Sequence, residues 1–410
     1  MKQAIILGLS LLVLIMVSAC SPAGVGLTSE EPIVAPEIPQ FEDVPAQKFE
    51  WITEDGGHSQ LDFNPQVDIL FVTDNSDSMK SAQANLLKNL DRFTSGITSN
   101  KMIDYHIGVI STWDSSDRFV QTKKDTYGIG ELRFVKDSKG VTSTTKRFVT
   151  KSDNNILAST LNIGVAPHAQ GGPEFEEFFS PLASSFEKTG RGAANEEFFR
   201  KDAQLVVIVL TDADDSSKSI SPEQMAQTLI DFKGGRRDKV SVYGVLVRAN
   251  TPDQSKDWDL RVHPKYHPEC FDMTVKPPKN NGTCTGFGPK NLEKFIYAAN
   301  ANAGTMEQAL AKYTMSIRSS DFGKDLGKIG DDITVKTLEK EILLQHRPRA
   351  DKNGVLALRV RYGNQVIPNN KDNGWLYNPE NNSVSLSGNI KYKYVEGARF
   401  AVDLIPVNVQ

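Results

Sequence analysis

The chain has 410 residues, which is enough for two domains and a tail. Its charged fraction of 24% and its formal net charge of -4 are typical of an ordinary globular protein. No stripe of basic residues runs through the sequence, so we exclude a nucleic-acid partner.

The chain begins with the pattern of a secretory signal peptide. Lys2 gives a short positive start, residues 4–17 form an apolar stretch, and small residues follow. This stretch is too short and too early for a typical transmembrane helix. We therefore predict that residues 1–20 are a signal peptide. Residues 21–62 contain five prolines and many acidic side chains, and we predict that they form a flexible tether.

An oxygen-rich loop follows the first predicted strand. Residues 67–73 are apolar, β-branched and aromatic, which indicates a buried strand, and apolar residues with helical spacing follow the loop. Between the strand and the helix lie Asp74, Ser76 and Ser78, in the pattern Asp-x-Ser-x-Ser. Open parallel sheets bind ligands outside the carboxyl ends of their strands. The loop is therefore a candidate cation site, although Ser and Asp are also common helix-capping residues.

A second predicted strand ends in a similar way. Residues 205–210 are continuously apolar and lead into Asp212, as expected for a strand in the middle of a covered parallel sheet. If the strand order reverses between the two strands, Asp212 and the Asp-x-Ser-x-Ser loop converge. Hydroxyl and carboxylate oxygens suit a hard cation, and we expect Mg²⁺, with Mn²⁺ or Ca²⁺ as alternatives. We expect the neighbouring Asp214 and Asp215 to be solvated loop residues.

Strands alternate with helices through the rest of this region. Residues 105–111 and 240–247 are predicted strands, and capping-box patterns at Ser221 and Thr305 predict the starts of helices. Such alternation predicts a mainly parallel central sheet covered by helices, a Rossmann-like α/β domain over residues 63–322.

A loop insertion is predicted at residues 250–290, and it contains two cysteines. In an exported chain, Cys270 and Cys284 are candidates for a disulfide bond, with two free thiols as the alternative. The nearby His263 and His267 do not complete a usual zinc-binding spacing.

The last part of the chain has a different pattern. Residues 333–410 contain short alternating runs separated by Gly and Asn turns, and Asn353-Gly354 is a hairpin signal. We predict a small antiparallel β domain here, with the form of a sandwich.

The two acidic strand ends resemble the metal-ion-dependent adhesion site (MIDAS) of von Willebrand factor A (vWA) domains. Asp74, Ser76 and Ser78 match the Asp-x-Ser-x-Ser pattern of that family, and Asp212 matches the Asp of its second strand-end motif. The resemblance implies that the two serines coordinate the ion directly and that the two aspartates support it, largely through water. The family usually has a Thr ligand in an intervening loop. The corresponding residues 162–174 contain no Thr, so water, Gln170 or Glu174 would have to substitute.

The end of the signal peptide resembles the lipobox of bacterial lipoproteins. This resemblance implies that Cys20 becomes the lipidated first residue of the mature protein. Because Ser21 rather than Asp follows, the same resemblance points to the outer membrane, with either face open.

These observations give one leading function and two alternatives. We expect a lipid-anchored envelope or cell-surface binding protein, without enzymatic activity, that engages a carboxylate of a protein partner through a bound divalent cation. One alternative is a structural scaffold of an envelope assembly with a degenerate metal site. The other is a metal-dependent hydrolase or phosphatase, although Ser76 stands where such phosphatases need a second Asp.

Overall fold

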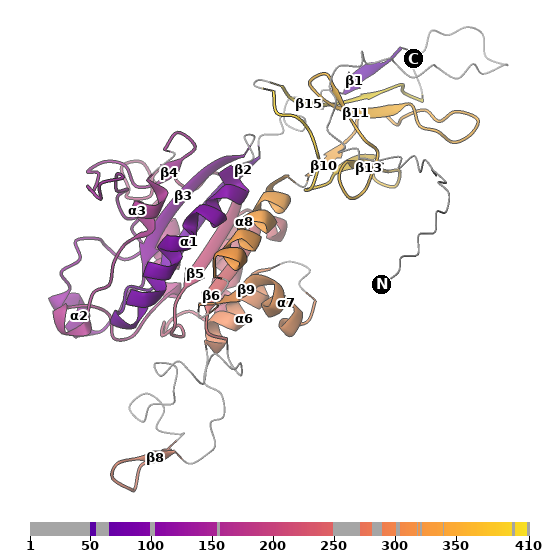
Figure 1. The fold of residues 1–410 in the computed structure, drawn as a ribbon. Helices are drawn as coiled ribbons and strands as arrows, with labels where there is room; N and C mark the ends of the chain where they lie inside the picture. Colours follow the sequence, from indigo (N-terminus) through magenta and orange to yellow (C-terminus); the bar gives the residue numbers. More distant parts are fainter. Residues whose placement is uncertain are drawn as a thin grey trace, which may run out of the picture.

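The chain forms an α/β domain and a smaller β domain (Figure 1). The computed structural model describes residues 50–54, 65–98, 103–153, 156–248, 271–280, 289–300, 304–317, 319, 322–338, 340–395 and 398–407. Among these residues, no helix has the length and the apolar character needed to cross a membrane.

The α/β domain is built on a six-stranded sheet with the order β4-β3-β2-β5-β6-β9. Every neighbouring pair is parallel except β4 with β3 at one edge. The strands are β2 (Gln66–Thr73), β3 (Asp104–Ser111), β4 (Val149–Thr150), β5 (Gln204–Leu210), β6 (Val240–Leu246) and β9 (Thr314–Ser316). All residues of β5 are buried, which is why this strand is apolar without alternation. The predicted mainly parallel sheet is confirmed.

Helices cover both faces of this sheet. The chain moves from β2 to β3 in one direction and from β5 to β6 in the other, so right-handed crossovers place α1 and α5 on opposite faces. α8 packs beside α1 (Figure 1), and α4 and α6 pack with α5. The helices are α1 (Lys80–Thr98), α2 (Asp117–Thr122), α3 (Leu157–Leu161), α4 (Phe179–Glu187), α5 (Pro222–Phe232), α6 (Lys290–Ala299), α7 (Met306–Tyr313) and α8 (Phe322–Leu338). Short 3₁₀ turns are η1 (Asp77–Met79), η2 (His168–Gln170) and η3 (Arg237–Lys239).

The β domain contains two antiparallel sheets around a core of its own, as predicted for the C-terminal region. One sheet has the order β1-β15-β11-β12 and the other β10-β14-β13. The strands are β1 (Ile52–Glu54), β10 (Lys340–Leu343), β11 (Leu358–Tyr362), β12 (Gln365–Ile367), β13 (Trp375–Asn378), β14 (Ser383–Leu386) and β15 (Phe400–Leu404). Val360, Val384 and Val402 are fully buried between them. A separate hairpin, β7 (Phe271–Asp272) with β8 (Lys279–Asn280), lies in the predicted loop insertion.

The domain boundaries differ from the predicted ones at two places. α8 continues to Leu338, because Leu326, Ile329 and Ile333 have helical spacing and are buried in the core of the α/β domain. That domain therefore extends past residue 322, and the β domain resumes at β10 rather than at residue 333. In addition, β1 lies inside the segment predicted as a tether, yet it is a strand of the β domain.

Candidate metal site

The candidate site lies where β2 and β5 end side by side. The two strands are parallel neighbours with Thr73 opposite Leu210, so the residues that follow them leave the sheet at one edge. The backbone N–H of Asp74 donates to the carbonyl of Leu210 at 2.9 Å, which fixes the two loops against each other. The order of the strands in the sheet therefore produces the predicted convergence of two strand ends that are about 140 residues apart in sequence.

Asp74 is buried beneath this edge and both of its carboxylate oxygens are engaged. Oδ1 accepts the backbone N–H of Ser76 at 2.8 Å, and Oδ2 accepts the hydroxyl of Thr211 at 2.8 Å. Burial raises the pKa of Asp74, and the hydrogen bonds from Ser76 and Thr211 oppose that rise. Asp74 therefore holds the two loops in place.

Three oxygen-bearing side chains follow one another above Asp74. The hydroxyls of Ser76 and Ser78 are 3.1 Å apart, and the Ser78 hydroxyl donates to Oδ1 of Asp212 at 3.0 Å. Ser76 and Asp212 are nearly buried, whereas Ser78 is partly exposed. The structure thus brings together all four residues that the sequence singled out after the ends of β2 and β5. The short turn η1 begins at Asp77, includes Ser78 and leads directly into α1.

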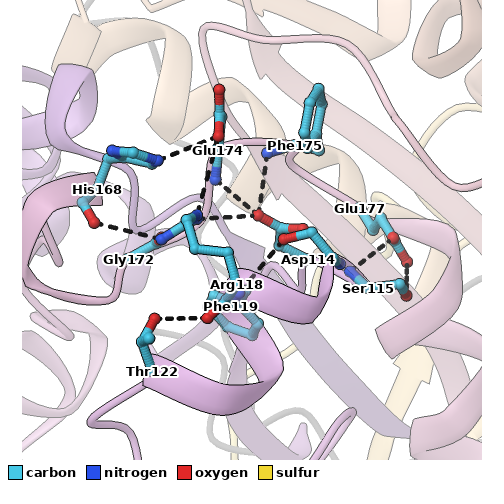
Figure 2. A network of polar contacts seen from close by, with 11 residues as sticks. Asp114, Ser115, Arg118, Phe119, Thr122, His168, Gly172, Glu174, Phe175 and Glu177 are labelled. Carbon is cyan, nitrogen blue, oxygen red and sulfur yellow. Dashed lines mark hydrogen bonds and ion pairs between the residues drawn. The ribbon is translucent and has the colours of Figure 1, made fainter.

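The fifth candidate, Glu174, is turned toward other residues (Figure 2). Its Oε2 lies 3.1 Å from Nε2 of His168 and 3.8 Å from Nε of Arg118. Its backbone N–H, with that of Phe175, donates to the buried carboxylate of Asp114. These contacts hold Glu174 in a network on the side of α2 rather than in the chain of contacts from Ser76 to Asp212.

Glu176 is the residue that sequence reasoning missed. Burial raises its pKa well above the ordinary value for Glu, and the nearby carboxylates of Asp74, Asp212 and Asp114 raise it further. Its carboxyl group therefore belongs to the same electrostatic environment as the two strand-end aspartates. The segment considered for a third ligand ended at residue 174, and a signal was available just beyond it, in the paired acids Glu176 and Glu177 before the apolar start of α4.

Two further carboxylates anchor the segment that carries Glu176. Glu177 accepts the backbone N–H and the hydroxyl of Ser115, both at 3.0 Å, and its backbone pairs with Trp113 in both directions. Asp215 accepts the backbone N–H groups of Phe178 and Phe179 at the start of α4. The prediction that Asp215 is a solvated loop residue is therefore wrong, because it stabilises the start of a helix.

Asp214 differs from the prediction for the same reason. Its carboxylate accepts the backbone N–H groups of Asn291 and Leu292 in the first turn of α6. Burial raises its pKa to about 7, and the hydrogen bonds from Asn291 and Leu292 oppose that rise. The start of α6 carries no sequence signal for a capping residue 77 positions earlier, so periodicity alone could not find this contact.

The donor set fits a hard divalent cation. Two neutral hydroxyls and one carboxylate lie next to one another, and Asp74 holds the loop that carries the serines, which matches the oxygen preference of Mg²⁺, Mn²⁺ and Ca²⁺. Within the described part of the chain, no cluster of three or more His, Cys, Asp or Glu side chains has the arrangement of a metal site. Metal binding here would thus depend on the serine hydroxyls.

No family model and no curated protein matches this chain. Solved structures match it as follows. The proximal thread matrix protein 1 from the mussel byssus, with a zinc-occupied MIDAS motif, is 14% identical, with 69% of this chain and 50% of that chain covered and a TM-score of 0.34. A von Willebrand factor type A protein from Catenulispora acidiphila is 12% identical, with coverages of 84% and 59% and a TM-score of 0.33. The pilus adhesin SpaC of Lactobacillus rhamnosus GG is 9% identical, with coverages of 83% and 38% and a TM-score of 0.33.

The chain spans about half the length of the solved structures that it matches first. At these identities and TM-scores, the similarity carries no conclusion about function. The assignment below therefore depends on the geometry of the site in this chain.

Proposed function

We propose that this chain is a lipid-anchored binding protein of the cell envelope, whose vWA-type domain holds a divalent cation and engages a carboxylate of a protein partner through it. The observation that carries the proposal is the contact series from Ser76 through Ser78 to Asp212, at the carboxyl edge of a parallel sheet. This edge is where α/β sheets bind ligands.

The chemistry of the site supports a bridging ion. Ser76 and Ser78 offer neutral oxygens and Asp212 one carboxylate, so few negative charges would touch the ion directly. An ion bound in this way keeps enough positive charge to attract one more carboxylate from outside. Asp74 would orient the serine loop through the Ser76 N–H and the Thr211 hydroxyl, and Glu176, a buried acid that interacts electrostatically with Asp74 and Asp212, is our candidate for the further acid of the site.

The contacts of Asp74 also favour binding over phosphatase chemistry. A nucleophilic aspartate needs a carboxylate oxygen free to attack, whereas both oxygens of Asp74 accept hydrogen bonds and the side chain is buried. A scaffold with a degenerate metal site is the remaining alternative, and metal content separates it from the leading proposal.

The location of the protein in the cell envelope is part of the same proposal. Three predictions lie outside the described residues and stay predictions: the signal peptide at residues 1–20, the lipidated Cys20, and the disulfide between Cys270 and Cys284. Mass spectrometry of the mature N-terminus tests the lipid. Thiol titration under denaturing conditions, with and without reductant, tests the disulfide.

Isothermal titration calorimetry with Mg²⁺, Mn²⁺ and Ca²⁺ tests the metal site. We expect binding by the wild type and a 10- to 100-fold or greater loss in Ser76→Ala and Asp212→Asn, the range typical for residues that hold or orient a metal. Asp77→Asn is the matched control, because Asp77 is an exposed carboxylate in the same loop and its loss should change the affinity less than about threefold. Equal binding by the wild type and Ser76→Ala would refute the metal assignment.

A pull-down from envelope extracts tests the partner. The wild type should retain a partner with Mg²⁺ present and release it with chelator, while Ser76→Ala should retain none. Retention that is the same with chelator would favour the scaffold alternative.

A further inference from the structure

Strand β1 joins the N-terminal part of the chain to the C-terminal β domain. It pairs antiparallel with β15, with Ile52 opposite Leu404 and Thr53 opposite Asp403. About 350 residues separate the paired positions, and the whole α/β domain lies between them in sequence. The chain therefore contributes β1 to the β domain before it enters the α/β domain.

Side-chain contacts show that this pairing is specific. Glu54 is 4% exposed, and its carboxylate accepts the backbone N–H groups of Gln345 and His346, at 3.1 and 2.8 Å, while His346 Nδ1 lies 2.7 Å away. These donors belong to the segment that follows β10. Burial of a carboxylate without hydrogen bonds is strongly unfavourable. The three donors around Glu54 therefore stabilise β1 in this position.

A second set of contacts fixes the other side of β1. The Thr53 hydroxyl donates to Oδ1 of Asp403 at 2.8 Å, and Asp403 also accepts from Arg359 and Arg361. Asp403 is only 2% exposed, and the guanidinium of Arg359 lies 4.8 Å from the centre of the Trp51 ring. Residues 51–54 thus contribute to a buried charge cluster of the β domain as well as to its sheet.

Both chain connections of the α/β domain leave it at the edge opposite the metal site. β2 starts at that edge, because it is parallel to β5 and both end at the metal site. α8 returns to it, since Lys336 near its end reaches the hydroxyl of Ser241 near the start of β6 at 3.1 Å. The end of α8 also packs on the β domain, where Gly388 is so close to the carbonyl of Val335 that a Cβ would lie 2.1 Å from it.

We propose that residues 51–54 act as a clamp strand, so that the α/β domain is an insertion between β1 and β10 of one split β domain. The β domain then holds both ends of the α/β domain, and a pull applied to the chain at residue 50 reaches the β domain first. The metal-binding edge lies at the far end of the α/β domain from this attachment, separated from it by the length of the strands. A role of this arrangement in adhesion rests on the proposed function, whereas the clamp strand itself rests on the contacts of β1.

Hydrogen exchange with mass spectrometry on the full chain tests the clamp. In Glu54→Ala, we expect the amides of Gln345 and His346 and those of β15 to exchange at least about tenfold faster, which corresponds to the loss of one hydrogen bond of about 1.4 kcal/mol. Peptides from β2 and β5 should exchange as in the wild type. Thr53→Val is a milder variant, which removes only the hydroxyl contact to Asp403 and should accelerate exchange in β15 by a smaller factor.

Glu50→Ala is the matched control, since Glu50 is an exposed carboxylate four residues before Glu54. It should leave exchange unchanged throughout. Unaltered exchange of β15 and residues 345–346 in Glu54→Ala would overturn the proposal. An equal acceleration in β2 and β5 would also overturn it, because the contacts of β1 would then not act on the β domain in particular. Mg²⁺ affinity measured on the same variants should equal that of the wild type, so failure of the clamp and failure of the metal site give different results.

Discussion

Replacement of Asp215 by Ala should destabilise the α/β domain and weaken metal binding without removing a ligand. The Asp215 carboxylate accepts four hydrogen bonds, from the backbone N–H groups of Phe178, Phe179 and Ser217 and from the Ser217 hydroxyl. Phe178 and Phe179 are fully buried at the start of α4, so water cannot replace the lost acceptor. Each unsatisfied buried N–H costs about 1–3 kcal/mol, and loss of a helix cap costs about 1–2 kcal/mol.

We therefore expect the free energy of unfolding to fall by about 2–4 kcal/mol in Asp215→Ala, and by roughly half of that in Asp215→Asn, which keeps one acceptor oxygen. Urea denaturation in chelator, followed by circular dichroism in the far ultraviolet, measures the change. Lys218→Ala is the control, because Lys218 is exposed in the same loop and its removal should alter stability by less than about 0.5 kcal/mol.

The effect of Asp215→Ala on the metal site follows from the position of Glu176 in the chain. Glu176 lies two residues before Phe178, so loss of the Asp215 contacts frees the segment that carries it. Mg²⁺ affinity should fall several-fold, in the range found when residues that orient a metal site are changed. A stability loss below about 0.5 kcal/mol would refute the reasoning. Unchanged affinity together with the expected stability loss would show that Glu176 does not act at the site.

Three further results are expected. Glu176→Gln should lower Mg²⁺ affinity about tenfold or more, whereas Glu174→Gln should change it less than about threefold, and the reverse order in calorimetry would contradict our placement of the two acids. Because the pKa of Asp214 is raised to about 7, the folded state binds an extra proton between about pH 4 and 7, so stability in chelator should fall as pH rises through that window, and Asp214→Asn should flatten the dependence measured by urea denaturation. Gly172→Ala should destabilise the domain by more than about 2 kcal/mol in the same assay, because its Cβ would lie 1.7 Å from the carbonyl oxygen of Ala166.

The central sheet and four residues of the candidate site could be predicted because their signals are local. β2 and β5 are buried on both faces and read as continuous apolar runs, and each leads directly into its acidic loop. Once the strand order places β2 beside β5, the convergence of Ser76, Ser78 and Asp212 follows from chain geometry. The β domain was visible for the same reason, since its strands alternate in sequence.

β1 could not be predicted from its own residues. Three residues are too few to show an alternating pattern, and they follow a segment rich in proline and acids. What makes them a strand is a set of partners near the other end of the chain, above all Asp403 and the N–H groups of Gln345 and His346. Such contacts between distant segments leave no periodicity in either one.

The acidic segment from Glu174 to Glu177 shows how long-range contacts distinguish neighbouring acids. Asp114 accepts the N–H groups of residues 174 and 175, and Asp215 accepts those of residues 178 and 179. Between these two fixed points, Glu177 is bound to Ser115. Glu174 is bound to Arg118 and His168, whereas burial and the carboxylates of Asp74 and Asp212 raise the pKa of Glu176. The choice is made by two aspartates on other elements, so a search for ligands within residues 162–174 could not have found it.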